Sequence, residues 1–129
     1  MTINVGINGM GRIGRMVVRA ITENQDKNIK IKHINNRSNS ETSCMLIKYD
    51  SVHGKFKADI DYDENHLIIN KNKITFSQES KIEDINWKKF GVDYVFECTG
   101  KFNSKDKLMI HINNGAKKVI VSAPCKNAD

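Results

Sequence analysis

A glycine-rich loop between a predicted strand and a predicted helix limits most strongly how this chain can fold. Residues 9–14 read GMGRIG, with glycine at the first, third and sixth positions. Before the loop, apolar and polar residues alternate over Ile3–Ile7, which is typical of a short strand. After the loop we expect a helix, whose buried side would be formed by apolar residues at helical spacing: Ile13, Met16, Val17, Ala20 and Ile21.

A second strand is predicted over residues 29–34, which completes a β-α-β unit around the loop. In such a unit Gly9 permits a sharp turn, Gly11 lets the backbone approach a pyrophosphate, and Gly14 lets the helix pack close to the strand. The start of the helix would present backbone N–H groups and its positive dipole end to the phosphates. A glycine-rich turn that serves packing alone is the alternative interpretation.

The rest of the chain continues this alternation of helices and strands. We expect a helix from Ser40 to about Tyr49 and a buried strand over 92–97. A helix over 104–113 and a strand over 119–121 follow, with Gly115 ending that helix.

Residues 56–76 differ from this pattern, because two β-like runs flank the turn-like sequence Asn70-Lys71-Asn72-Lys73. An antiparallel β insertion is predicted there. The fold class is therefore α/β, a Rossmann-type doubly wound parallel sheet with a small antiparallel β insertion.

Composition narrows the possible partners and the compartment. The 21 Lys and Arg residues exceed the 15 Asp and Glu residues, but they are spread thinly with few aromatic residues between them, so we expect a solvated surface and no nucleic-acid partner. No apolar run is long enough to cross a membrane, and no membrane partner is expected. The three cysteines lack zinc-site spacing, which predicts no metal site and a reducing, cytoplasmic compartment.

Polar residues follow three of the predicted parallel strands, at Asn35-Asn36, Thr99-Gly100 and Ser122-Ala123-Pro124. Because ligands of such sheets bind at the carboxyl ends of the strands, we expect these residues to converge on one crevice. The position after the second strand usually holds an acidic residue that binds the adenosine ribose. This chain has Asn36 there, followed by Arg37.

Four blocks in register along the chain carry a family resemblance: residues 5–15 (VGINGMGRIGR), 48–56 (KYDSVHGKF), 97–100 (ECTG) and 115–124 (GAKKVIVSAP). In order and spacing they closely resemble the N-terminal half of the phosphorylating glyceraldehyde-3-phosphate dehydrogenases. The resemblance implies a nicotinamide dinucleotide cofactor and a homotetramer for the full-length protein. It also implies oxidation of glyceraldehyde 3-phosphate to 1,3-bisphosphoglycerate with hydride transfer to the cofactor.

The resemblance also indicates which residues contact the cofactor. The backbone of Arg12 and Ile13 would hold the pyrophosphate, and Asn36 would face the adenosine ribose. Ser80 stands where the family commonly has an adenine-side Arg. The full set of expected cofactor-binding residues is Asn8, Gly9, Gly11, Arg12, Ile13, Asn36, Arg37, Ser80, Thr99, Gly100 and Ser122.

The family's nucleophilic Cys and its activating His would lie beyond Asp129. We therefore expect residues 1–129 to be a dinucleotide-binding domain, incomplete at its C-terminus, with the catalytic domain absent, no catalytic residues and no turnover of its own. None of Cys44, Cys98 and Cys125 is expected to act as a nucleophile, because nothing in the sequence pairs one with a base. Erythrose-4-phosphate dehydrogenase, which shares these blocks, and a stand-alone nucleotide-binding module are the alternatives.

Asn36 also bears on the choice between NAD and NADP. A carboxylate at this position would repel the 2′-phosphate of NADP, whereas Asn36 is neutral and Arg37 supplies a cation. We therefore expect NADP to be accepted at least as readily as by relatives that carry Asp. The alternative is that Asn36 bonds a ribose hydroxyl of NAD while Arg37 points to solvent.

Overall fold

The computed structural model describes residues 3–24, 28–48, 59–99 and 105–121. The strands in this part of the chain are β1 Ile3–Asn8, β2 Ile29–Asn35, β3 Ile60–Asp63, β4 His66–Ile69, β5 Asn72–Ser77, β6 Tyr94–Glu97 and β7 Lys118–Val121. The helices are α1 Arg12–Asn24, α2 Ser40–Lys48, α3 Lys105–Asn113 and the short 3₁₀ helix η1 Ile82–Asp84. None of the helices described is long and apolar enough to span a membrane.

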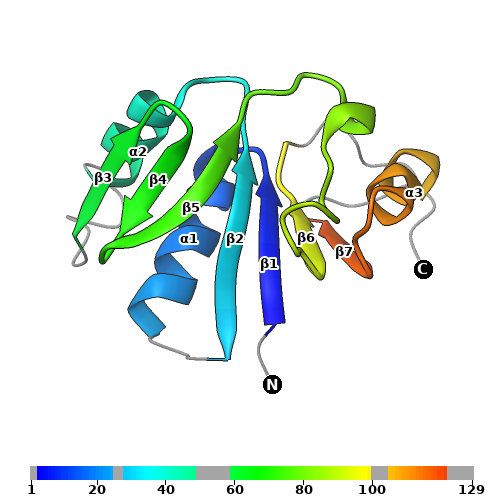
Figure 1. Cartoon of the computed structure of the whole chain (residues 1–129), viewed down its shortest axis with the longest axis horizontal. Coiled ribbons are helices and arrows are strands. Elements are labelled where there is room, and N and C mark those ends of the chain that lie inside the picture. The colour runs from blue at the N-terminus through cyan, green and yellow to red at the C-terminus, as the bar shows by residue number, and fades with distance from the viewer. Residues whose placement is uncertain (1–2, 25–27, 49–58, 100–104, 122–129) are drawn as a thin grey trace.

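These strands form one sheet in the order β3-β4-β5-β2-β1-β6-β7 (Figure 1). β1 pairs in parallel with β2 and with β6, β2 pairs in parallel with β5, and β6 pairs in parallel with β7. The predicted α/β class with a mostly parallel sheet is confirmed. Because β1, β2 and β6 are neighbours and run in the same direction, their carboxyl ends lie at one edge of the sheet, which is the upper edge in Figure 1.

The predicted antiparallel insertion is present over β3, β4 and β5. The turn between β4 and β5 lies at Asn70 and Lys71, whose φ values of 50° and 70° are both positive, as a type I′ hairpin requires. β5 also pairs in parallel with β2, with Thr75 opposite His33. The insertion is therefore continuous with the parallel sheet; residues 56–58 of the predicted segment lie outside the described residues.

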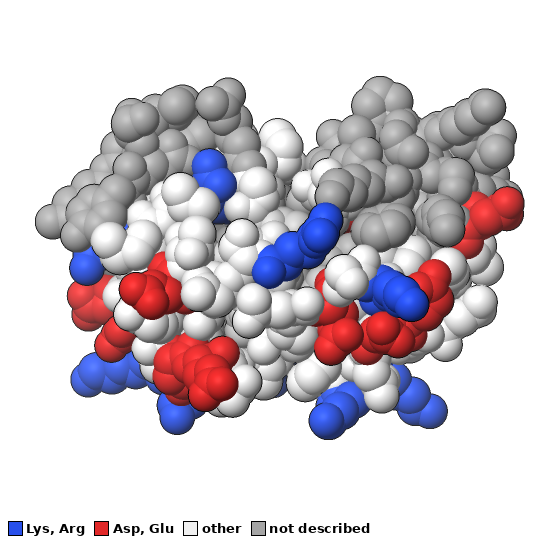
Figure 2. Space-filling model, turned by 90° about the horizontal axis from the view of Figure 1, so that it is seen from above, with Lys and Arg blue, Asp and Glu red and all other residues white. Residues whose placement is uncertain are grey.

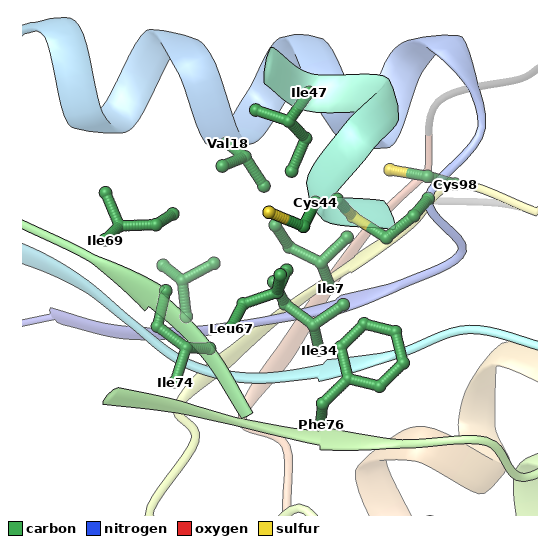
Figure 3. Packing of buried hydrophobic residues seen from close by; sticks show 12 residues of the cluster. Ile7, Val18, Ile34, Cys44, Ile47, Leu67, Ile69, Ile74, Phe76 and Cys98 are labelled. Atoms are coloured by element: carbon green, nitrogen blue, oxygen red, sulfur yellow. The ribbon is translucent and has the colours of Figure 1, made fainter. Parts of the chain in front are cut away.

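One hydrophobic core lies between the sheet and the helices α1 and α2 (Figure 3). Ile7, Ile34 and Leu67 from the strands meet Val18 and Ile47 from the helices, and all five side chains are fully buried. Each buried side chain of this kind stabilises the fold by about 1.5–3 kcal/mol. This packing holds α1 and the loop before it against the sheet.

The predicted buried side of α1 is only partly right. Val17 and Ile21 pack against the core, beside the buried Val18. Gly14 lies against the carbonyl of Gly9, so the helix approaches the sheet along the line that runs from Gly14 to Val18 and Ile21. The other three residues of the predicted stripe are consequently exposed: Ile13, Met16 and Ala20.

Local features explain where α2 begins and where α3 ends, and both boundaries agree with the prediction. α2 begins at Ser40, and the Oδ1 of Asn39 accepts a hydrogen bond from the Thr42 N–H at 2.9 Å, which caps the helix. Gly115 follows the end of α3 with a φ of 117°, a conformation that favours glycine.

A second core covers the opposite face of the sheet, under η1, the segment after it and α3. Trp87 is fully buried there, and its ring lies so close to β1 that a Cβ on Gly6 would come within 2.5 Å of it. Helices on both faces make the sheet doubly wound. Near the carboxyl ends of the strands this face is polar, because Asn8, His33, Asn35 and Glu97 are buried there.

Candidate functional site

The loop between β1 and α1 contains three glycines with different surroundings. Gly9 has a φ of 98°, and a Cβ there would lie 2.9 Å from the backbone N of Thr99. A Cβ on Gly14 would lie 2.1 Å from the carbonyl oxygen of Gly9. A Cβ on Gly11 would meet no described atom within 4 Å. Packing explains the glycines at positions 9 and 14 but not Gly11, which argues against a loop shaped by packing alone.

The start of α1 faces the space that Gly11 leaves open. The Arg15 N–H donates to the carbonyl of Gly11 at 3.0 Å, so the N–H groups before it have no acceptor within the helix. No acidic residue occupies the first turn of α1. These N–H groups and the positive end of the helix dipole suit a phosphate group, and the bare backbone at Gly11 lets it come close.

A cavity of about 210 Å³ opens beside this loop, at the carboxyl ends of β1, β2 and β6. The predicted cofactor-binding residues that line it are Asn8, Gly9, Gly11, Asn36, Arg37, Ser80 and Thr99. The lining also includes Asn35, which was expected at this crevice as the end of the second strand, and four residues for which no place in the site was predicted: Met10, Glu79, Ile82 and Cys98. All of these except Ile82 are direct sequence neighbours of predicted residues, which is the signal that could have identified them.

Among the predicted residues whose side chains the structure describes, Ile13 is the one outside the cavity lining. Arg12 and Ile13 are the first two residues of α1, and the Ile13 side chain is exposed. Gly100 and Ser122 lie outside the described residues.

Figure 2 shows the molecule from above, with a basic side chain across the middle of this face and the visible acidic side chains in two groups to either side.

Asn36 connects the end of β2 to the glycine-rich loop. Its Oδ1 accepts a hydrogen bond from the Met10 N–H at 3.1 Å, and its Nδ2 donates to the Ser43 hydroxyl at 3.4 Å. A carboxylate in the same place could still accept from Met10, since that bond requires only an acceptor. The charge at position 36 can therefore change without loss of this contact. Among the described residues that line the cavity, Arg37 is the cation and Glu79 is the carboxylate.

Asn35 holds the segment that carries Glu79 and Ser80 against the end of β2. Its Oδ1 accepts from the Glu79 N–H at 2.9 Å and from the Ser77 hydroxyl at 2.6 Å. Its Nδ2 donates to the Glu79 carbonyl and to the Oδ1 of Asn8, both at 2.9 Å. These four bonds fix the orientation of the Asn35 amide and one wall of the cavity.

A buried carboxylate lies behind this lining. Glu97, at the end of β6, is 1% exposed. Its Oε1 accepts from the Nδ2 of Asn8 at 2.7 Å and from the Nε2 of His111 at 2.8 Å. Its Oε2 accepts from the N–H and the hydroxyl of Thr99 at 3.0 and 2.7 Å. Glu97 belongs to the block ECTG at residues 97–100, but its place in the sequence predicts no role for it.

The tautomer of His111 follows from its other neighbour. The Nε1–H of Trp87 donates to the Nδ1 of His111 at 2.9 Å. Because an indole N–H can only donate, the proton of His111 lies on Nε2 and is directed to Glu97. A continuous set of hydrogen bonds thus joins Trp87, His111 and Glu97 to Thr99 at the cavity.

Cys44 and His33 both lie in buried surroundings that disfavour their charged forms. Cys44 lies in the first core, and burial raises the pKa of its thiol. His33 stacks on Phe90 with ring centroids 3.8 Å apart, and burial lowers its pKa from 6.5 to about 4. Cys125 lies outside the described residues. In the part of the chain that the structure describes, no group of three or more His, Cys, Asp or Glu residues is placed to hold a metal ion.

Comparison with known proteins supports a dinucleotide site. Residues 3–105 match the family model described as "Glyceraldehyde 3-phosphate dehydrogenase, NAD binding domain". The glyceraldehyde-3-phosphate dehydrogenase of Thermotoga maritima is 44% identical over 125 residues, 97% of this chain and 38% of the relative. That of Geobacillus stearothermophilus is 43% identical over 129 residues, 100% of this chain and 38% of the relative. The chain therefore spans less than two fifths of the length of these relatives.

Proposed function

Because this chain belongs to the glyceraldehyde-3-phosphate dehydrogenase family through its NAD-binding domain, we propose that it forms the cofactor-binding part of a phosphorylating dehydrogenase. The longer protein would oxidise glyceraldehyde 3-phosphate to 1,3-bisphosphoglycerate. One observation supports this function most directly, which is the bare backbone of Gly11 in front of the start of α1. The glycine leaves room for a pyrophosphate at the end of the helix that attracts it.

In this proposal the protein binds and orients the cofactor. The N–H groups of Arg12 and Ile13 donate to the pyrophosphate, and Asn36, Arg37 and Ser80 lie toward the adenosine. On the other side of the loop, Thr99 lies toward the nicotinamide. The family resemblance assigns the same role to Gly100 and Ser122, which lie outside the described residues. When bound, the nicotinamide supplies the hydride acceptor.

Calorimetric titration of residues 1–129 with NAD tests the binding function. We expect binding without oxidation of glyceraldehyde 3-phosphate. Catalysis needs an activated nucleophile held beside its base, and Cys44 is buried with a raised thiol pKa. Measurable oxidation by this polypeptide would contradict the expected lack of turnover, and absence of NAD binding would contradict the proposed function.

A chimera tests whether the site supports the full reaction. This chain would replace the aligned segment of the Geobacillus stearothermophilus enzyme, which matches it over its whole length. We expect NAD-dependent oxidation of glyceraldehyde 3-phosphate by the chimera and at least tenfold less by a chimera carrying Gly11→Ala. A folded chimera that binds substrate but does not reduce NAD would contradict the proposal.

We propose further that the site accepts NADP as well as NAD. Asn36 replaces the acidic residue that would repel a 2′-phosphate, by up to about 4 kcal/mol at 4 Å at an effective dielectric constant of 20. Arg37 lies in the same cavity wall and is exposed, so it can reach a phosphate. Glu79 is the described lining residue whose charge opposes NADP, and its backbone is held in place by Asn35.

Binding of both cofactors to three variants tests this preference. Asn36→Asp should lower the affinity for NADP at least tenfold without lowering that for NAD. Arg37→Gln should also lower the affinity for NADP selectively. Glu79→Gln should raise the affinity for NADP and leave that for NAD unchanged. If the unmodified chain binds NAD a hundredfold more tightly and Asn36→Asp leaves that ratio unchanged, the charge argument is wrong.

We also propose that the protein works in a reducing, cytoplasmic compartment. Cys44 is a free, buried thiol, which supports this, and Cys98 is also buried. Thiol labelling of the denatured protein, taken from its native cells, should find both cysteines reduced, and a disulfide involving either would contradict the proposal.

A further inference from the structure

The structure assigns Glu97 a positioning role toward the bound dinucleotide, which it performs through Thr99. Glu97 lies behind the cavity lining, and we infer that it fixes both the place and the hydrogen-bonding direction of Thr99 at the cavity edge. This inference rests on the proposed cofactor-binding function. It adds a residue that would not touch the cofactor itself.

Two of the side chains that face the Glu97 carboxylate are fixed as donors by their other hydrogen bonds. The Oδ1 of Asn8 already accepts from Asn35, so its Nδ2 must be the atom that faces Glu97. The Nδ1 of His111 already accepts from Trp87, so its Nε2 must carry the proton. A side chain that only accepts is therefore required at position 97, and an ionised carboxylate meets this requirement.

This arrangement determines what Thr99 offers to a ligand. The single hydroxyl proton of Thr99 is used in the 2.7 Å bond to Glu97. Toward any further partner its hydroxyl oxygen can therefore only accept a hydrogen bond. A dinucleotide carries suitable donors in its ribose hydroxyls and its carboxamide N–H group. Glu97 thus selects for a ligand donor at this edge of the site.

The effect should be confined to one end of the ligand. Thr99 follows β6 and Asn36 follows β2, and β1 lies between these two strands. With neighbouring strands about 4.8 Å apart, the two positions are separated by roughly 10 Å. NAD can reach both, whereas AMP carries only the adenosine half and one phosphate. AMP is therefore a probe for the Asn36 side of the same cavity.

Glu97→Gln changes the hydrogen bonding at position 97 with little change in shape. Whichever way the amide turns, its NH₂ group faces donors, either those of Thr99 or those of Asn8 and His111. We expect the affinity for NAD, measured by calorimetry on the full chain, to fall at least tenfold while that for AMP changes less than twofold. The matched change Glu64→Gln, at an exposed position between β3 and β4, should alter the affinity for neither NAD nor AMP.

Thr99 variants provide a second test that leaves the buried carboxylate in place. Thr99→Val should weaken NAD at least tenfold and leave AMP unchanged, and Thr99→Ser, which keeps the hydroxyl, should retain NAD affinity within about threefold. The double variant Glu97→Gln/Thr99→Val should lose no more NAD affinity than the weaker-binding of the two single variants, because both changes remove the same interaction.

The outcomes separate this inference from the function on which it rests. Losses that multiply in the double variant, or NAD affinity within twofold of the unmodified chain in folded Glu97→Gln, would overturn the inference alone. If Glu97→Gln does not fold, Thr99→Val decides, and unchanged NAD affinity overturns the inference. An unmodified chain that binds neither NAD nor AMP would overturn the proposed function and this inference with it.

Discussion

Gly11→Ala and Gly14→Ala add the same methyl group to the same loop, but we expect Gly14→Ala to lower the stability of the fold and Gly11→Ala to lower the affinity for NAD. A Cβ on Gly14 would lie 2.1 Å from the carbonyl oxygen of Gly9, whereas ordinary C···O contacts are about 3.3 Å or longer. α1 would have to move away from the loop. A Cβ on Gly11 would meet no described atom within 4 Å.

The magnitudes follow from these contacts. For Gly14→Ala we take the upper end of the overpacking cost, about 3 kcal/mol, because the blocking atom belongs to the backbone. Alanine within a helix restores about 1 kcal/mol, which leaves a net loss of about 2 kcal/mol in the free energy of unfolding.

For Gly11→Ala the cost of alanine before the first turn of a helix is up to about 1 kcal/mol. The lower entropy of the unfolded chain offsets about 0.4–1 kcal/mol of it. Its stability should therefore stay within about 0.5 kcal/mol of the unmodified chain, while NAD affinity falls at least tenfold, or about 1.4 kcal/mol.

Urea unfolding followed by Trp87 fluorescence measures the first effect, because Trp87 is the only tryptophan and is fully buried. Calorimetric titration with NAD measures the second. Gly11→Ala with unchanged NAD affinity would refute the role of the bare backbone. Gly14→Ala with unchanged stability would refute the packing argument for the loop.

Three further predictions concern stability. Lowering the pH from 7 to 5 should lower the free energy of unfolding by about 2 kcal/mol through His33. The pKa of His33 is about 4 in the folded chain, so in this range only the unfolded chain takes up a proton at this residue. Urea unfolding at both pH values should show a smaller pH dependence for His33→Gln, and an equal one would contradict this. Lys71→Gly should raise the thermal midpoint by about 2–5 °C, because it relieves about 1 kcal/mol of strain at a φ of 70°; an unchanged or lower midpoint would contradict it. Gly6→Ala should cost about 1–3 kcal/mol, because its Cβ would lie 2.5 Å from the Trp87 ring, and unchanged urea unfolding would count against that contact.

Local pattern was sufficient to predict much of the fold. The change from strand to helix periodicity at residues 9–14 locates β1 and α1, and the Asn70–Lys71 turn is where the sequence predicts it. The parallel pairing of β5 with β2 was not predicted, because it joins residues as distant as His33 and Thr75. Likewise, the buried side of α1 depends on how Gly14 seats the helix, which periodicity does not reveal.

The candidate site could be predicted only at the level of strand ends. Parallel strands bring their carboxyl ends together, so positions such as Asn36 and Thr99 follow from topology. The contacts of Asn36 with Met10, and of Glu97 with Asn8, depend on the directions of side chains from separate elements. Asn8 and Glu97 are 89 residues apart in sequence, and neither residue by itself indicates a buried hydrogen-bonded set.

In the function proposed for this chain, the glycine-rich loop and the start of α1 bind the pyrophosphate of a nicotinamide dinucleotide. The most direct measurement is an NMR titration of the ¹⁵N-labelled chain with NAD. We predict that the amide signals of Gly11, Arg12, Ile13 and Thr99 shift in a saturable manner, while that of Lys71 in the hairpin turn does not. Saturable binding that leaves the signals of residues 11–13 unchanged would contradict the account.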